Sequence, residues 1–257
     1  MSSRTAPQHD HPGTPEDEAA VAEREPGAQL PNIPLLEDAL AHPEDEKKPT
    51  WRGWIHAGTA PLAVAAGVVL IVLAPSVGGK VGAAVFAGSS ILLFGISAVY
   101  HRFNWSPKVK AVFRRLDHAN IFLLIAGTYT PMALTALPAT EGIILLSLVG
   151  GGALLGILFR VFWLSAPRWS YVPLYLLLGW AAVIFAGPLI AHNWVAMLLV
   201  LIGGISYTVG ALFYGFKRPN PIPGVFGFHE LFHTCTVIAF MCHWTAALLM
   251  VLDPIVW

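Results

Sequence analysis

Seven long apolar runs limit what this chain can fold into. Each contains about 20 predominantly apolar residues, which is the length an α-helix needs to cross the hydrocarbon core of a bilayer. A backbone surrounded by lipid must satisfy its own hydrogen bonds, so such runs fold as helices. The sequence therefore predicts an all-α membrane protein built as a bundle of seven transmembrane helices. The runs are Trp54–Ala74, Val81–His101, Asp117–Leu137, Gly142–Trp163, Tyr171–Ala191, Trp194–Phe216 and Gly227–Leu252.

The composition agrees with a membrane protein, and the acidic residues are concentrated at one end. The chain is 56% hydrophobic and 12% charged, with a mean hydropathy of +0.64. Of the 15 Asp and Glu residues, 11 precede Pro49. Residues 1–50 contain no aromatic residue, and they cannot bury enough apolar area to offset the entropy lost on ordering. We expect residues 1–50 to form a disordered, acidic cytoplasmic tail and residues 51–257 to form the membrane domain.

The Lys and Arg residues of the membrane domain fall almost entirely in alternate connections. Lys80 is the exception, because it lies between the first and second runs. Cytoplasmic loops carry the excess of Lys and Arg, so the N-terminus is predicted to be cytoplasmic and the C-terminus outside, in the plasma membrane. No apolar run occurs in the first 30 residues, so we do not expect a cleaved signal peptide. The net charge of zero is misleading, because the acidic tail cancels a basic membrane domain, and no footprint for nucleic acid is visible.

Four ionisable residues at the ends of the apolar runs are candidates for a functional site. Seven crossings place the end of the second helix and the starts of the third and seventh on one side of the membrane. His101, Asp117 and the pair His229 and His233 stand at these ends. His229 and His233 are four residues apart, so their imidazoles lie on one helix face about 6 Å apart. This spacing suits two ligands of one Zn²⁺ ion, with His101 as the third.

Three protein ligands with an open fourth position are typical of catalytic zinc, which ionises a bound water near pH 7. Asp117 could accept a hydrogen bond from that water, and Ser97, one turn before His101, could donate to the water or to a substrate carbonyl. The sequence thus predicts Asp117 and Ser97 as catalytic residues. Each also has a structural reading, since Asp117 could cap the third helix and Ser97 could pack between helices.

Other polar residues in the apolar runs have less specific readings. His56 could be a further ligand, whereas His118 is predicted to be an interfacial group. His243 lies about 15 Å deeper than His233 along the helix, so a satisfied intramembrane hydrogen bond is expected there. Cys235 and Cys242 are expected to be buried small hydrophobic residues, without a disulfide.

The run His229–His233 also matches H-E-x-x-H, the zincin pattern in which Glu is the general base. An intramembrane metalloprotease would need a third, acidic ligand, and Asp253 is the candidate. Asp253 lies about 30 Å along the same helix from His233, which is too far. Glu230 also points about 100° away from the two histidines. We expect it to pair with a cytoplasmic Arg or Lys instead.

Four stretches together are similar to one known family. Ser97–His101, Arg115–Asn120, Ala126–Pro131 and Lys217–His233 read SAVYH, RLDHAN, AGTYTP and KRPNPIPGVFGFHELFH. They resemble the hemolysin III family, the bacterial branch of the progestin and adipoQ receptor superfamily, which includes the adiponectin receptors and is related to alkaline ceramidases. The similarity covers residues 51–257.

The resemblance implies a seven-helix bundle with a cytoplasmic N-terminus and a zinc ion near the cytoplasmic face. The zinc ligands it implies are His101, His229 and His233, with Asp117 binding through water and Ser97 nearby. Members of the wider superfamily are described as lipid amide hydrolases, while the bacterial branch was named for haemolytic activity.

These observations predict a zinc-dependent hydrolase of a lipid amide or ester, with membrane lipid as both surroundings and substrate. One alternative is a non-enzymatic sensor or regulator of membrane state, in which zinc is a structural link between helices. Another is a pore or cytolysin, although the sequence shows no ring of charges or polar-lined helix beyond the site.

Overall fold

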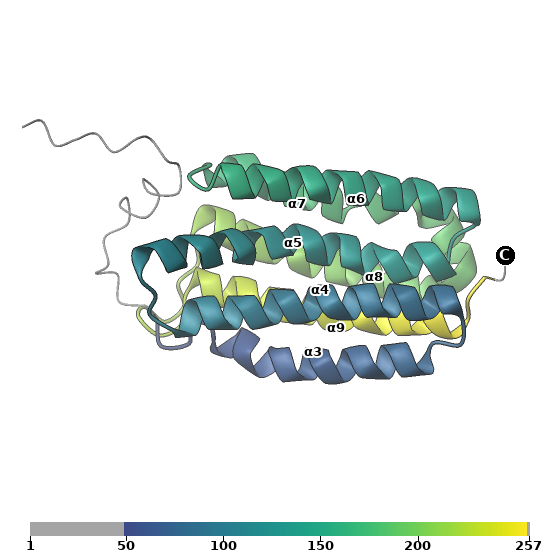
Figure 1. Ribbon diagram of the computed structural model, residues 1–257, viewed down its shortest axis with the longest axis horizontal. Coiled ribbons are helices and arrows are strands. Elements are labelled where there is room, and N and C mark those ends of the chain that lie inside the picture. Colours follow the sequence, from purple (N-terminus) through teal and green to yellow (C-terminus); the bar gives the residue numbers. More distant parts are fainter. Residues whose placement is uncertain (1–48, 256–257) are drawn as a thin grey trace, which may run out of the picture. The chain divides into compact units, whose positions relative to one another are not determined.

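The computed structural model describes residues 49–255, and most of the expected acidic tail lies outside this part. Within it the regular elements are helices, with one isolated bridge between Ile222 and Phe226. The helices run side by side along a common axis (Figure 1). They are α3 (Trp54–Leu73), α4 (Val77–Arg102), α5 (Pro107–Thr135), α6 (Ala139–Phe162), α7 (Arg168–Gly179), the 3₁₀ turn η1 (Ala181–Phe185), α8 (Ala186–Phe216) and α9 (Phe228–Leu252).

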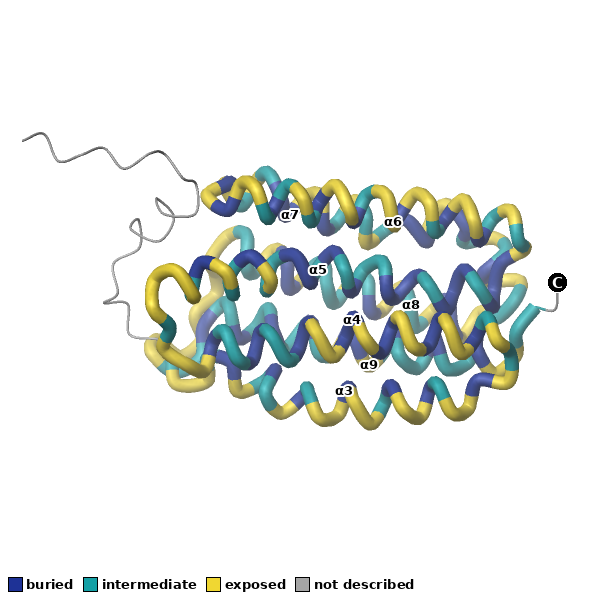
Figure 2. The backbone as a smooth tube through the Cα atoms, viewed as in Figure 1, coloured by how far each residue is buried: buried dark blue, intermediate teal, exposed yellow. Residues whose placement is uncertain are grey.

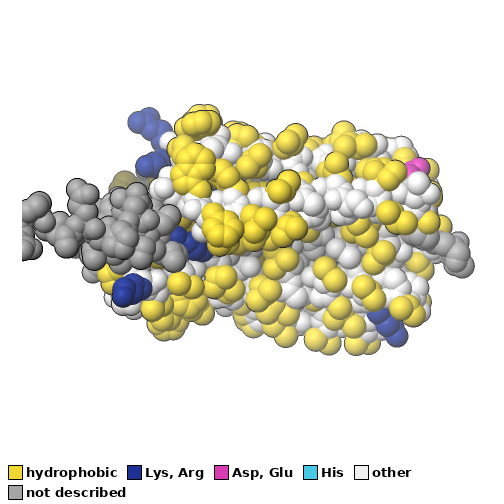
Figure 3. Space-filling view, turned by 45° about the horizontal axis from the view of Figure 1, so that its top comes forward, with side chains coloured by type: hydrophobic (Ala, Val, Ile, Leu, Met, Phe, Trp, Pro, Cys, Tyr) yellow, Lys and Arg dark blue, Asp and Glu magenta, His cyan; other side chains and the backbone are white. Residues whose placement is uncertain are grey.

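Five helical stretches of the described chain are long and apolar enough to cross a membrane. Only 28% of the most apolar window of Trp54–Leu73 is buried inside the protein, so most of this helix faces outward. Figure 2 shows the same exposure along α3 and α6. In Figure 3 apolar side chains cover the middle of the visible face, and most of its Lys and Arg side chains gather at one end. The prediction of a helical, multi-pass membrane protein is therefore confirmed. The five stretches are Trp54–Leu73, Val77–Arg102, Ala139–Phe162, Arg168–Phe216 and Phe228–Leu252.

The longest of these stretches folds back on itself. Inside α8, Asn193 has non-helical backbone angles (φ −156°, ψ 98°), which break the helix. The Arg168 Nη1 donates to the Tyr214 carbonyl over 2.7 Å, and the Trp180 Nε1 donates to the Thr208 hydroxyl over 3.1 Å. These contacts pair residues before the break with residues after it in antiparallel order. The break lies between the two apolar runs that the sequence predicts here.

Helix α5 differs from the predicted run Asp117–Leu137, because it begins ten residues earlier, at Pro107. The extra turns are rich in Lys and Arg, which lower hydropathy but favour a helix as much as most residues do. Within these turns Arg115 Nε donates to the carbonyl of Val161 over 3.0 Å. Carbonyls in the last turn of a helix such as α6 lack intrahelical partners, and a cation there is favourable. The alternative that Asp117 caps the helix is wrong, since it lies inside α5.

Close packing of α4 against α5 and α9 sets the positions of the site residues. A Cβ atom on Gly82 would lie 2.6 Å from the Cα of Pro131, so α4 and α5 approach backbone to backbone there. Small residues permit such approaches in membrane bundles. Phe240 of α9 packs against Phe86 and Phe94 of α4, with ring centroids 5.8 and 5.0 Å away. These contacts hold the end of α4 beside the start of α9.

Candidate metal centre

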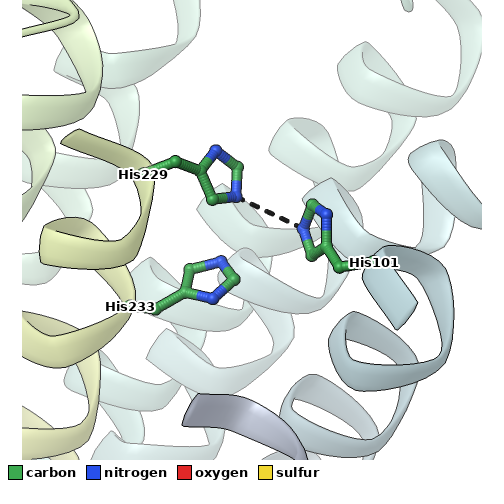
Figure 4. A group of neighbouring side chains, drawn as sticks. All are labelled: His101, His229 and His233. Atoms are coloured by element: carbon green, nitrogen blue, oxygen red, sulfur yellow. Dashed lines mark hydrogen bonds between the residues drawn. The ribbon is translucent and has the colours of Figure 1, made fainter. Parts of the chain in front are cut away.

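Three histidines from α4 and α9 face one another at one end of the bundle. His101 stands in the last turn of α4, and His229 and His233 stand in the first two turns of α9. Their imidazoles converge in Figure 4, where the dashed line joins the Nε2 atoms of His101 and His229 at 3.3 Å. One ring nitrogen from each of the three lies within 4.8 Å of the others. The three side chains are therefore close enough to hold one metal ion.

The donor set fits zinc. Two nitrogen ligands at about 2.0–2.1 Å from a tetrahedral zinc ion lie about 3.3 Å from each other. The Nε2 atoms of His101 and His229 already have this separation. His101 and His233 are only 7% and 3% exposed, so a cation here would compete with little water. Neutral imidazole is a preferred ligand of Zn²⁺.

Asp117 and Ser97 lie beside the histidines. The Asp117 Oδ2 is 3.8 Å from the Nε2 of His101, which is too long for a direct hydrogen bond. The buried Ser97 hydroxyl interacts with the Asp117 carboxylate. Three of the predicted site residues lie on α4 and α5, and two lie on α9, so the bundle brings all five to one end. Ser97, His101 and Asp117 therefore share the surroundings of His229 and His233.

His56 of α3 packs on the centre without joining the ligand group. Its ring stacks on that of His233 with centroids 3.7 Å apart and planes inclined by 5°. An imidazole binds a metal in its ring plane at about 2.0–2.1 Å, so two parallel rings at this spacing cannot both point at one ion. The group of three histidines accordingly excludes His56. In this arrangement His56 is a neighbour of a candidate ligand, His233.

Glu230 is occupied by structural contacts. It is 1% exposed and pairs with the Nε of Arg52, as the sequence predicted for an Arg or Lys partner. Its other oxygen accepts a hydrogen bond from the Gly227 amide over 2.9 Å, which closes a capping box at the start of α9. A carboxylate held in this way is not free to act as the general base of a zincin. The protease alternative therefore lacks its base.

His118 is a further neighbour of the site. Its side chain is 14% exposed, and its Nδ1 donates to the Arg114 carbonyl over 2.8 Å. Its Nε2 lies 3.3 Å from the hydroxyl of Tyr214, and Nδ1 lies 4.0 Å from the carboxylate of Asp117. The only sign in the sequence that His118 lies near the site is its position next to Asp117. No sequence feature indicates the contact between His118 and Tyr214, which is 96 residues away.

A long cavity of about 110 Å³ begins at the centre and continues into the bundle. Asp117, His229 and His233 line one end, while residues as deep as Met132 and His243 line the other, and the walls are mostly apolar. The Nε2 of His243 donates to a backbone carbonyl over 3.1 Å, as expected. Its Nδ1 has no partner within residues 49–255. Cys235 and Cys242 are unpaired thiols, but both are half-buried rather than buried as the sequence predicted.

Comparisons with known proteins identify relatives over most of the described helices. The family model described as haemolysin-III related matches residues 45–244. The hemolysin-3 homolog of Bacillus subtilis is 36% identical over 161 residues, which are 61% of this chain and 75% of that protein. Hemolysin-3 of Bacillus cereus is 35% identical over 167 residues, or 63% and 76% of the two chains.

A more distant relative comes from an animal. Progestin and adipoQ receptor-like protein 1 of Caenorhabditis elegans is 29% identical over 183 residues, which are 64% of this chain and 42% of that protein. The resemblance inferred from the four sequence stretches is thus confirmed over most of the described bundle. The chain belongs to the haemolysin III family of multi-pass membrane proteins, within the progestin and adipoQ receptor superfamily.

Proposed function

We propose that this protein is a zinc-dependent hydrolase of a lipid amide or ester, embedded in the plasma membrane. The observation that carries the proposal is the position of three imidazoles and a carboxylate at one end of a long apolar cavity. Ligand pockets are typically apolar with a few converging polar groups, and this one joins such groups to an acyl-sized space.

The proposed topology has seven crossings with a cytoplasmic N-terminus. Four of the apolar stretches are single helices, and the stretch Arg168–Phe216, folded at Asn193, would supply two crossings. Helix α5 would supply the seventh, with its charged first turns outside the hydrocarbon region. The Lys and Arg bias supports a metal centre near the cytoplasmic face. Residues 1–50 would be a tail and residues 51–257 the membrane domain.

The chemistry proposed for the site divides between the metal and the side chains. Zinc held by His101, His229 and His233 would polarise a carbonyl and lower the pKa of a bound water. Asp117 would accept the proton of the water and later deliver it to the leaving amine or alcohol. Ser97 would donate its hydroxyl proton to the Asp117 carboxylate and so orient it. The apolar walls of the cavity would hold the acyl chain and exclude bulk water.

The test is an assay of purified full-length protein in detergent on ceramide-like amides and phospholipid esters. We expect turnover by the zinc-loaded protein, loss of turnover after chelation, and its return when zinc is added back. A control without protein but with the same zinc concentration measures background hydrolysis. Turnover that chelation leaves unchanged would contradict a metal-dependent reaction.

A second candidate is a membrane sensor in which zinc is structural. It is favoured by the contact between His101 and His229, which are 128 residues apart in the chain, because a shared ion would link α4 to α9. For this function, chelation would lower the thermal unfolding midpoint while no substrate of either class is turned over. The cytolysin alternative rests on the name of the Bacillus cereus relative, hemolysin-3.

The cavity predicts selectivity for acyl-chain length. Thr128 lines the cavity about 16 Å along α5 from Asp117, and its hydroxyl donates only to the preceding turn of its own helix. Thr128→Phe should therefore shorten the space and lower kcat/KM for long-chain substrates about tenfold or more, while short chains are spared. The measurement is a series of substrates that differ only in chain length.

The matched control is Thr130→Phe, because Thr130 makes the same kind of bond within α5 but does not line the cavity. Its chain-length profile should match that of the wild type. Equal losses for short and long chains in Thr128→Phe would speak against an acyl chain in the cavity.

A further inference from the structure

The five residues from Arg52 to His56 run past all three histidines of the candidate metal centre. The first contact is backbone packing. Gly53 has a φ of +82°, and a Cβ atom there would lie 2.8 Å from the Cβ of His101. Glycine adopts this conformation without penalty and leaves the space that His101 occupies. The start of α3 thus lies directly against the base of one ligand.

The second contact acts on the residue next to His229. Arg52 pairs with Glu230, whose carboxylate also accepts from the amide of Gly227. One side chain therefore connects the segment before α3 to the first turn of α9. An ion pair that is buried on the glutamate side is costly to break, because the remaining charge loses its partner. The pair fixes the backbone that carries His229.

The third contact is the stack of His56 on His233. The rings are parallel at 3.7 Å, and Phe94 supports His56 from the side with its ring centroid 5.0 Å away. His56 is buried, and neither of its ring nitrogens has a partner within residues 49–255. The ring of His56 therefore contacts the centre through its face. It restricts rotation of the His233 ring about its side-chain bonds.

The same segment is anchored on its outer side. The amide of Trp51 donates to the carbonyl of Val225 over 3.2 Å, in the connection between α8 and α9. The guanidinium of Arg102 lies 4.2 Å from the centroid of the Trp54 ring, which joins the segment to the residue after His101. The segment is thus tied to both ligand-bearing helices.

We propose that residues 52–56 form a brace that positions the three histidines and sets the affinity of the centre for its metal. The proposal rests on the zinc site proposed above. Metal-bound histidines are usually oriented by hydrogen bonds from neighbouring groups, and loss of such a partner typically costs 10–100-fold in metal affinity. Here the histidines would be oriented in two ways, by packing against Gly53 and His56 and by the ion pair of Arg52 with Glu230. Arg52, Gly53 and His56 are positioning residues.

The first experiment measures zinc affinity of the detergent-purified full chain by competition with a coloured chelator. Gly53→Ala pushes a methyl group into His101, and it should weaken zinc binding about 10–100-fold. Gly58→Ala is the matched control, because a Cβ atom on Gly58 meets nothing within 4 Å. It should bind zinc as the wild type does. Thermal unfolding of the metal-free proteins reports separately on any loss of fold stability.

The second experiment distinguishes positioning from general packing. His56→Ala removes the stacked ring and should weaken zinc binding about tenfold or more, whereas His56→Phe restores a flat ring and should recover most of the affinity. With Co²⁺ as the probe, the visible d–d bands should change in intensity or position for His56→Ala, because they report ligand geometry. Those of His56→Phe should resemble the wild type.

The outcomes separate this proposal from the proposed function. Wild-type affinity and cobalt spectra in both Gly53→Ala and His56→Ala would overturn the brace while leaving the zinc hydrolase intact. A wild-type protein that binds zinc, depends on the brace, but hydrolyses no lipid would support the brace and contradict the enzyme. A wild-type protein that binds neither metal would overturn both.

Discussion

Replacing His233 with alanine is expected to reduce bound zinc from about one ion per chain to a small fraction and to abolish lipid hydrolysis. Zinc binding by small protein sites is worth roughly 10–16 kcal/mol, so one of three or four ligands accounts for about 3 kcal/mol or more. A loss of that size weakens affinity at least about a hundredfold. His233 is almost fully buried, so solvent is poorly placed to replace the missing nitrogen.

Metal analysis of the purified protein measures this effect, and His101→Ala should behave in the same way, because its imidazole lies in the same group of three. His192→Ala is the matched control, since His192 lies in α8 next to the break at Asn193 and outside this group. It should retain wild-type zinc. Zinc that persists in both ligand variants would require a different set of ligands and would reject the proposed centre.

The sequence predicted the helical bundle and the clustering of the histidines for simple physical reasons. Apolar runs of spanning length must fold as helices in lipid, and the four-residue spacing of His229 and His233 places them on one helix face whatever surrounds it. The number of predicted membrane crossings places His101 on the same side of the membrane as this pair. None of these arguments depends on how any helix is rotated about its axis.

Two features were not predicted from the sequence. One depends on how a helix is rotated about its axis, and the other depends on charged residues within a helix. The start of α5 was missed because Lys and Arg mask helix in a hydropathy pattern, although Arg115 binds a carbonyl of α6. The stack of His56 on His233 was missed because it requires α3 to turn one particular face inward. A lipid-exposed helix such as α3 is apolar on nearly every face, so its periodicity does not reveal which one packs.

Asp117→Asn is expected to keep the metal and lose the reaction. The amide has nearly the shape of the carboxylate but does not accept a proton, and general acid–base groups typically contribute 10²–10⁴-fold to a rate. We therefore expect kcat to fall about 10²–10⁴-fold while zinc content stays near that of the wild type. Steady-state kinetics on the best substrate, combined with metal analysis of the same sample, gives both values.

Asp253→Asn provides the control for this substitution. Asp253 follows the last turn of α9, whereas the histidines occupy its first two turns, so it is remote from the centre. Its substitution should leave kcat unchanged. If Asp117→Asn lost its zinc together with its activity, Asp117 would be a ligand rather than the proton carrier proposed here.

In this cavity, metal binding and acyl-chain selection depend on different helices. The metal-holding atoms come from α4 and α9, whereas much of the deep end is formed by other helices, through residues such as Tyr129, Trp180 and Thr208. Substitutions at such deep positions would alter which acyl chains fit and leave metal binding unchanged. Directed evolution of new lipid preferences would therefore start from libraries on α5, α7 and α8. Related proteins would be able to differ in substrate preference while they keep the same metal centre.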